Sequence, residues 1–170
     1  MASLMEELLT TMEGETEHYK RLIDLNDKKK DSIIYQKLTE LESITAQEQA
    51  IAEELASLEK KRLSLLNHMA VVMGREGEEI TVSWMIDNLS NQPEDQNRLR
   101  KAKDDLVEAA KTMQTFNRQN QALLSQALEM VEYDITLIKS MKQAPQTANY
   151  GRDAQNTGDL LSMQRFDAKQ

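Results

Sequence analysis

The longest hydrophobic pattern of this chain runs from Pro93 to Lys142. Apolar side chains recur there at alternating steps of three and four residues, and eleven of the thirteen positions in the row are apolar. The row is Leu99, Ala102, Leu106, Ala109, Met113, Phe116, Asn120, Leu123, Ala127, Met130, Asp134, Leu137 and Met141. An average step of 3.5 residues keeps one side of a helix turned toward a partner helix. The pattern therefore predicts a single helix about 75 Å long, and with it an elongated molecule.

A first helix is predicted to begin near residue 3, where Ser3 and Glu6 have capping-box spacing. Its buried side is expected to carry Met5, Leu8, Met12, Tyr19 and Leu22. The pattern fades at Asn26 and Asp27, before the lysines of 28–30, which suit the negative end of a helix dipole. The sequence leaves open whether the helix runs on through residue 30.

A second helix is predicted to start at a cap formed by Asp31 or Ser32 and to end before Gly74. Glu48 and Arg62 interrupt its apolar row, and we interpret them as marginal positions with buried stems and charged ends in water. The row is Ile34, Leu38, Leu41, Ile44, Glu48, Ile51, Leu55, Leu58, Arg62, Leu65, Met69 and Val72.

A short apolar cluster follows, and it predicts one short helix that folds over the end of the helical hairpin. Its members are Val82, Trp84, Met85, Ile86 and Leu89. Trp84, the only tryptophan, is expected to pack against the core. Pro93 suits the first position of the long helix, and Glu94 and Asp95 favour the positive end of its dipole.

The composition changes after Met141, because residues 144–170 contain a proline, two glycines and many Gln, Asn and Thr. This tail is expected to be flexible in isolation. Four apolar residues return near its end: Leu160, Leu161, Met163 and Phe166. So few cannot form a core alone, and they suit anchors that become ordered on a partner.

Together these elements predict an all-α fold: an elongated antiparallel hairpin or three-helix coiled-coil-like bundle, with a short connecting helix. Residues 1–143 are assigned to an elongated helical domain and residues 144–170 to a flexible partner-binding tail. Only two prolines, five glycines and seven aromatic residues are present, too few for a sheet protein.

The charge and composition narrow the classes of partner. A net charge of -8 argues against nucleic acid and against an anionic membrane surface. Cysteine is absent, and the longest apolar run, Met69 to Met73, is too short to cross a bilayer. A cytoplasmic protein without direct membrane insertion is expected.

Catalytic chemistry has little support in the sequence. Glu15 and His18 have the Glu-x-x-His spacing of paired-metal bundles, but the other histidine, His68, follows Leu65 and does not repeat the motif. No phosphate-binding loop, dinucleotide turn or nucleophile elbow is found. We therefore expect no enzyme activity, no metal and no cofactor.

The second half of the long helix carries apolar groups on two neighbouring stripes, beginning just after Asn120. An amide on the seam can fix register or oligomer state. A face this wide must be covered, either by the first two helices or by the amphipathic helix of a partner.

At these residues the chain resembles the FlgN family of flagellar export chaperones. The similarity lies in the segment Phe116 to Leu124, in its continuation Ala127 to Val131, and in the pair Tyr150 and Gly151. The family's tail often has a second glycine where this chain has Ala154. The order of the helices matches over nearly the whole chain.

The resemblance implies a chaperone that binds the terminal segments of the hook-filament junction proteins FlgK and FlgL, prevents premature assembly and delivers them to the flagellar type III export gate. Tyr150 is the candidate for recognition by the gate. The residues expected to contact the client are Leu124, Leu128, Val131, Ile135, Ile138, Leu160, Leu161 and Phe166.

The main alternative is a coiled-coil scaffold or adaptor that oligomerises through the long helix. The sequence also leaves open whether that helix pairs within its own chain or exchanges with a second copy to form a homodimer.

Overall fold

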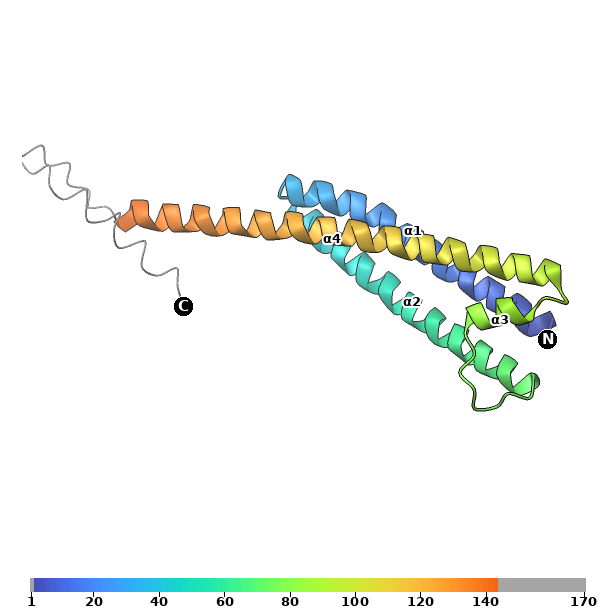
Figure 1. The fold of residues 1–170 in the computed structure, drawn as a ribbon. Helices are drawn as coiled ribbons and strands as arrows, with labels where there is room; N and C mark the ends of the chain where they lie inside the picture. The colour runs from blue at the N-terminus through green and yellow to red at the C-terminus, as the bar shows by residue number, and fades with distance from the viewer. Residues whose placement is uncertain (1, 144–170) are drawn as a thin grey trace, which may run out of the picture. The chain divides into compact units, whose positions relative to one another are not determined.

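The computed structural model describes residues 2–143, and this part of the chain is helical without strands (Figure 1). Its helices are α1 (Ala2–Ile34), α2 (Leu38–Val72), α3 (Val82–Asn88) and α4 (Pro93–Gln143). The predicted all-α class, the short connecting helix and the long last helix are confirmed. The predicted tail of residues 144–170 lies outside the described residues, so its role as a separate region stays a prediction.

Helices α1 and α2 form an antiparallel hairpin. Early residues of α1 contact late residues of α2, as in the pair Glu15 and Arg62, whereas Lys29 near the end of α1 contacts Glu48. Gly14 lies in this interface: a Cβ at its position would be 3.6 Å from the side chain of Leu58, an ordinary van der Waals distance. The hairpin is the framework on which the other helices pack.

The boundary between α1 and α2 differs from the prediction. α1 continues unbroken to Ile34, so Asp31 and Ser32 do not cap a second helix. The chain turns instead at Gln36, whose φ of 53° lies in the left-handed region. The Lys37 amide donates to the Ser32 carbonyl and the Gln36 amide to that of Ile33, which is the Schellman pattern of a helix end. Glycine usually occupies this position, so the sequence carried no breaker to mark the turn.

The main core lies at the end of the hairpin where α1 begins and α2 ends. α3 lies across this end, and Thr81 caps it by accepting a hydrogen bond from the Trp84 amide. Trp84 packs against the core, as expected, with Arg75 5.0 Å from its ring centre. Buried side chains come from all four helices and from the α2–α3 connector: Met5, Leu8, Leu9, Met12, Leu65, Leu66, Met69, Ala70, Ile80, Val82, Met85, Ile86, Leu89, Leu99 and Ala102.

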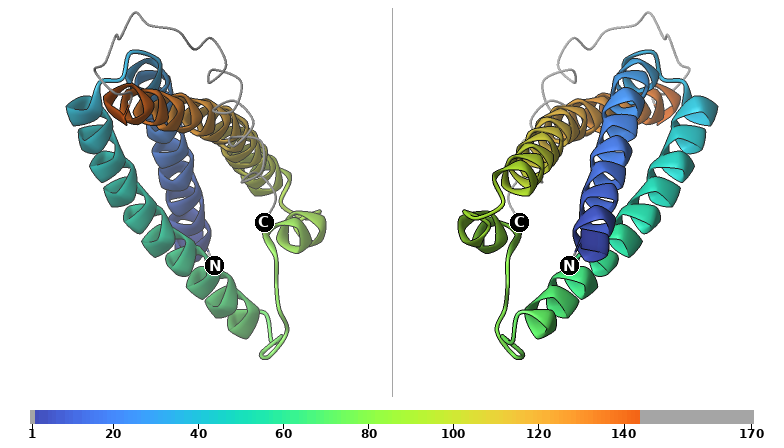
Figure 2. Two further views of the ribbon diagram at one scale, coloured as in Figure 1. Left: turned by 90° about the vertical axis from the view of Figure 1, so that its left-hand side faces the viewer. Right: turned by 90° about the vertical axis from the view of Figure 1, so that its right-hand side faces the viewer.

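Helix α4 runs parallel to α1 and lies beside it (Figures 1 and 2). Arg98 pairs with Glu6 near the start of both helices, and Asn120 bonds Asn26 further along both. A smaller cluster of buried residues, formed by Leu22, Leu25, Ile44 and Ile51, holds the far part of the hairpin, and Met113 of α4 packs against it. The first part of α4 is thus a third member of the bundle.

The chain divides into two units, Met1–Met130 and Val131–Gln170. The bundle belongs to the first unit. The described part of the second unit is residues 131–143, which form the last turns of α4.

Candidate partner-binding surface

The apolar row of α4 is covered from Leu99 to Ala127. Leu99 is fully buried, and Ala102, Ala109 and Asn120 are also buried. The intervening row positions are partly buried: Leu106, Met113, Phe116, Leu123 and Ala127. This stretch therefore uses its seam to pack within the chain.

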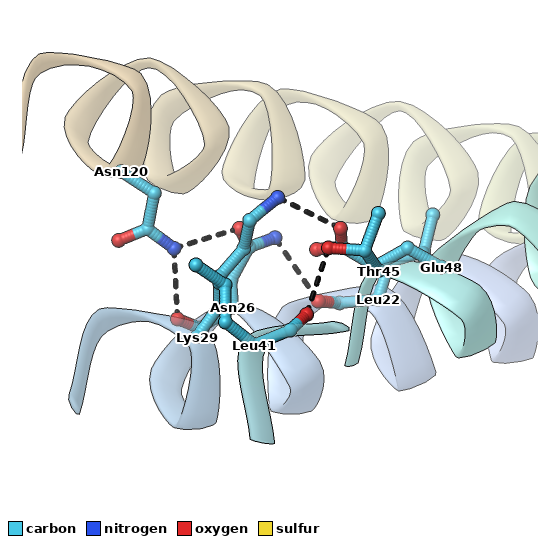
Figure 3. Close-up of polar contacts among 7 residues, drawn as sticks. All are labelled: Leu22, Asn26, Lys29, Leu41, Thr45, Glu48 and Asn120. Carbon is cyan, nitrogen blue, oxygen red and sulfur yellow. Dashed lines mark hydrogen bonds and ion pairs between the residues drawn. The ribbon is translucent and has the colours of Figure 1, made fainter. Parts of the chain in front are cut away.

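Asn120 is a buried polar residue on this seam, with 4% of its surface exposed. Its side-chain amide donates to the main-chain oxygen of Asn26 at 2.8 Å and to the Asn26 side-chain oxygen at 3.0 Å (Figure 3). Asn26 in turn donates to the Leu22 carbonyl at 3.0 Å. A buried amide is tolerated only when its hydrogen bonds are made, so this pair selects one register of α4 on α1.

The same register shows where α1 stops covering α4. The pairs Glu6 with Arg98 and Asn26 with Asn120 are separated by 92 and 94 residues. At the second separation, Ile34 at the end of α1 is level with Leu128 of α4. Helix α4 continues to Gln143, so its row of apolar residues is longer than the helix that covers it.

Every described side chain from Leu128 to Gln143 is exposed. Among the described residues, this segment holds half of the sixteen large apolar side chains that are exposed. They are Leu128, Met130, Val131, Tyr133, Ile135, Leu137, Ile138 and Met141. Such a concentration on one helix is typical of an interaction surface.

Five of the predicted client contacts follow one another along α4 at steps of four and three. We call these residues the client stripe: Leu124, Leu128, Val131, Ile135 and Ile138. Leu124 is partly buried, and the other four have exposed fractions between 41% and 56%. The remaining predicted contacts, Tyr150, Leu160, Leu161 and Phe166, lie outside the described residues.

The charged ends of Glu48 and Arg62, the two charged residues in the α2 row, were expected to lie in water. In the structure both form ion pairs with residues of α1. The Arg62 guanidinium donates to both carboxylate oxygens of Glu15, at 2.9 and 3.2 Å, and the Glu15 side chain is only 4% exposed. Burial raises the pKa of the Glu15 carboxyl above its ordinary value, and Arg62 opposes part of that rise. Glu48 likewise accepts from the Lys29 ammonium at 2.8 Å, with both side chains largely covered (Figure 3). These pairs join α1 to α2.

The Glu-x-x-His motif is used in the same interface. Glu15 binds Arg62, whereas His18 contacts the Gly14 carbonyl at 2.7 Å through Nδ1 and the Glu54 carboxylate through Nε2. Between residues 2 and 143 no group of three or more potential metal-ligating side chains is gathered. No helix in that range is both long and apolar enough to span a membrane.

A concavity, which we call the α2–α4 concavity, lies between α2, the α2–α3 connector and α4. It encloses about 800 Å³ and includes the exposed side chains of Leu63, Val71 and Val107. Its walls hold a mixture of charges, with Arg62 and Lys103 against Glu78 and Glu79. It does not include the client stripe.

Sequence reasoning missed one further group of exposed apolar residues. Ile34 and Leu38 were predicted to lie in the buried row of a second helix, but the structure places them on either side of the α1–α2 turn. Ile34 is 50% exposed, Leu38 is 71% exposed, and Tyr35 between them is 69% exposed. Only the position of the turn could have identified them, and no glycine or proline marks it.

Comparison with known protein families identifies the family of this chain. The family model described as FlgN protein matches residues 1–158 of the chain. The chain belongs to the FlgN family. This is a family of flagellar export chaperones and not of enzymes. No curated protein and no solved structure was found to match this FlgN-family chain.

Proposed function

We propose that this FlgN-family chain is a cytoplasmic chaperone for the terminal amphipathic segments of the hook-filament junction proteins FlgK and FlgL. It keeps these segments from assembling early and delivers them to the flagellar type III export gate. The observation that carries the proposal is the concentration of exposed apolar side chains on α4 from Leu128 to Met141, which includes four of the five residues of the client stripe.

The physical argument is that the client stripe offers a ready binding face to an amphipathic helix. Side chains at alternating steps of four and three fit the helix-in-groove mode of recognition. A client that is unfolded before binding loses about 2–5 kcal/mol of the gross interaction energy in ordering. The complex can then be extensive and still release its client at the gate.

Calorimetric titration of the full chain with the C-terminal segment of FlgK or FlgL tests the proposal. Replacing Leu128 and Ile138 together with serine is expected to weaken binding at least about tenfold, because both side chains lie on the client stripe. Val72→Ser is the control, since Val72 is 58% exposed and Leu128 is 56% exposed. Equal affinities for the double variant and the wild type would exclude the stripe as the client site.

The tail belongs to the proposal as a second contact. Leu160, Leu161 and Phe166 are proposed to anchor the client, and Tyr150 to be recognised by the export gate. Removing residues 144–170 is expected to weaken client binding. Tyr150→Ala is expected to reduce gate binding alone, and loss of both activities together would show that Tyr150 supports the fold.

A scaffold that oligomerises through α4 is the second candidate, because the exposed apolar row could also pair with another copy. Light scattering of the client-free chain separates the two. A monomer that binds amphipathic segments supports the chaperone, whereas a stable oligomer indifferent to them supports the scaffold.

A further inference from the structure

The α2–α4 concavity continues along the bundle into a second hollow. This hollow encloses about 450 Å³ and shares the lining residues Arg62, Leu106 and Val107 with the concavity. We call the two together the α2–α4 groove. All of its lining residues belong to the unit Met1–Met130, and none of them belongs to the client stripe.

Three helices build the α2–α4 groove. Helix α1 forms the floor with Met12, Glu15, Tyr19 and Leu22, which follow one another at steps of three and four. Helices α2 and α4 form the walls, and both views of Figure 2 draw α1 between them. Side chains at these steps lie along one face of a helix, so the groove follows α1 for about 15 Å. One helix with two neighbours leaves the fourth corner of a four-helix bundle open.

The walls of the groove carry apolar side chains that the bundle leaves exposed. Leu63 and Val71 of α2 and Val107 of α4 have exposed fractions between 40% and 53%. Leu55 and Met113, further along the two walls, are partly buried. Apolar side chains on both walls suit an amphipathic helix that buries its apolar row between them.

The charged pairs inside the groove are already formed. The Arg62 guanidinium lies 2.9 Å from the Glu15 carboxylate and reaches Glu59 only at 3.9 Å. Glu78 pairs with Arg75 at 2.8 Å. An apolar side chain can therefore cover the pair of Glu15 and Arg62 without leaving a buried charge alone.

The rim of the groove has a surplus of negative charge. The exposed carboxylates of Glu59 and Glu79 lie on α2 and on the α2–α3 connector. Beyond the charged pairs, Lys103 of α4 is the cation among the described lining residues. Charge at the rim of an interface steers and selects a partner of opposite sign. The helix that complements this groove therefore carries basic residues beside its apolar row.

We propose that the α2–α4 groove is a second docking surface, which takes an amphipathic helix with basic margins from a partner protein other than the client. The helix fills the open corner of the bundle. Its apolar row packs on Leu63, Val71 and Val107, and its basic residues approach Glu59 and Glu79. The inference goes beyond the proposed function, because it leaves the client stripe free.

The test uses two designed helical peptides of about 15 residues. Both have leucines at steps of three and four. The basic peptide has lysines along the margins of this row, and the acidic peptide has glutamates in their place. In calorimetric titration of the full chain at low salt, the basic peptide is expected to bind at least about tenfold more tightly, and added salt is expected to reduce the difference. Equal affinities at low salt would contradict the charge argument.

Variants of the chain locate the bound peptide. Leu63→Ser with Val107→Ser is expected to weaken binding of the basic peptide about tenfold, whereas Val72→Ser, outside the lining, stays within about twofold of the wild type. Thermal unfolding followed by circular dichroism is expected to be unchanged, because Leu63 and Val107 are at least 40% exposed. Normal binding by the groove variant would exclude the groove. Loss of binding in Leu128→Ser with Ile138→Ser alone would place the peptide on the client stripe and overturn the inference.

Competition separates this inference from the proposed function. Saturating the chain with the C-terminal segment of FlgK is expected to leave the affinity for the basic peptide within about twofold. If the segment displaces the peptide from the groove, the client itself occupies the groove and the inference is wrong. If the groove binds the peptide but the chain binds neither the FlgK nor the FlgL segment, the proposed function fails and the second docking surface stands.

Discussion

Two stretches of α4 carry apolar residues at the same spacing but differ in what covers them. From Leu99 to Ala127 the row packs on α1 and on the hairpin core, and an amide pair at Asn120 fixes its register. From Leu128 to Gln143 the side chains are exposed. The difference arises from the length of α1, which turns at Gln36, and not from the composition of α4. A helical seam thus identifies a surface that needs a partner helix, but the partner can belong to another chain.

The largest expected contrast is between leucines of the two stretches. Leu99→Ala removes a fully buried side chain from the main core and is expected to lower the free energy of unfolding by about 2–5 kcal/mol. Leu137→Ala, at a residue that is 46% exposed, is expected to change it by less than about 0.5 kcal/mol. Urea unfolding followed by circular dichroism measures both, and equal losses would mean that the second stretch is covered in solution.

The hydrogen-bonded pair Asn26 and Asn120 is expected to give the next largest change in the free energy of unfolding. Asn120→Ala deprives the Asn26 oxygens of their buried donor and is expected to cost about 1–3 kcal/mol of unfolding free energy. Gln121→Ala, on the exposed side of the same turn of α4, serves as the control and is expected to stay within about 0.5 kcal/mol. If the two variants unfolded at the same urea concentration, the register argument would lose its support.

Two carboxyls of α1, those of Glu15 and Glu6, are expected to change the stability of the bundle with pH in opposite directions. Burial raises the pKa of Glu15, so its contribution to stability is full below the ordinary pKa of 4.5 and is lost as pH rises through the raised value. From pH 4 to pH 7, wild type is therefore expected to lose stability relative to Glu15→Gln.

Glu6 provides the matched control. The hydrogen bond and the charge of Arg98 lower the pKa of the Glu6 carboxyl, so its contribution is present above 4.5 and is lost as pH falls through the lowered value. Wild type is expected to gain stability relative to Glu6→Gln over the same rise in pH, by a small amount because the pair is exposed. Trends of the same sign for both variants would contradict the raised pKa of Glu15 or the lowered pKa of Glu6.

The smallest expected effect concerns the turn that ends α1. Gln36→Gly removes the cost of a left-handed backbone at a side-chain-bearing residue and is expected to raise the free energy of unfolding by about 0.5–1 kcal/mol. Lys37→Gly, where φ is −85°, is expected to give no gain. A gain at Lys37 and none at Gln36 would show that this turn does not have the described backbone.

Much of the fold could be predicted from hydrophobic periodicity, because the rows of α2 and α4 each persist over many turns. The short helix was also predictable, since Gly74, Gly77 and Pro93 bracket its apolar cluster. The α1–α2 boundary was not, because Gln36 adopts a conformation usually marked by glycine. Apolar residues on both sides of the turn then merged into one apparent row.

The site was predictable only in part. The doubled apolar stripe after Asn120 indicated a surface, but its exposure depends on where α1 ends. The roles of Glu15 and Arg62 depend on which residues of α1 and α2 face each other, and a pattern along one helix does not contain that information. The exposed residues Ile34, Tyr35 and Leu38 were missed because no glycine or proline marks the α1–α2 turn.

The central claim is that the end of α4, which is exposed among the described residues 2–143, is the surface that a client covers. Amide hydrogen exchange of the full chain with and without the FlgK C-terminal segment tests this most directly. Residues 99–120 are expected to be protected in both samples, whereas residues 128–143 exchange quickly alone and become protected with the client. Protection of residues 128–143 before the client is added, or new protection confined to the α2–α4 concavity, would contradict the account.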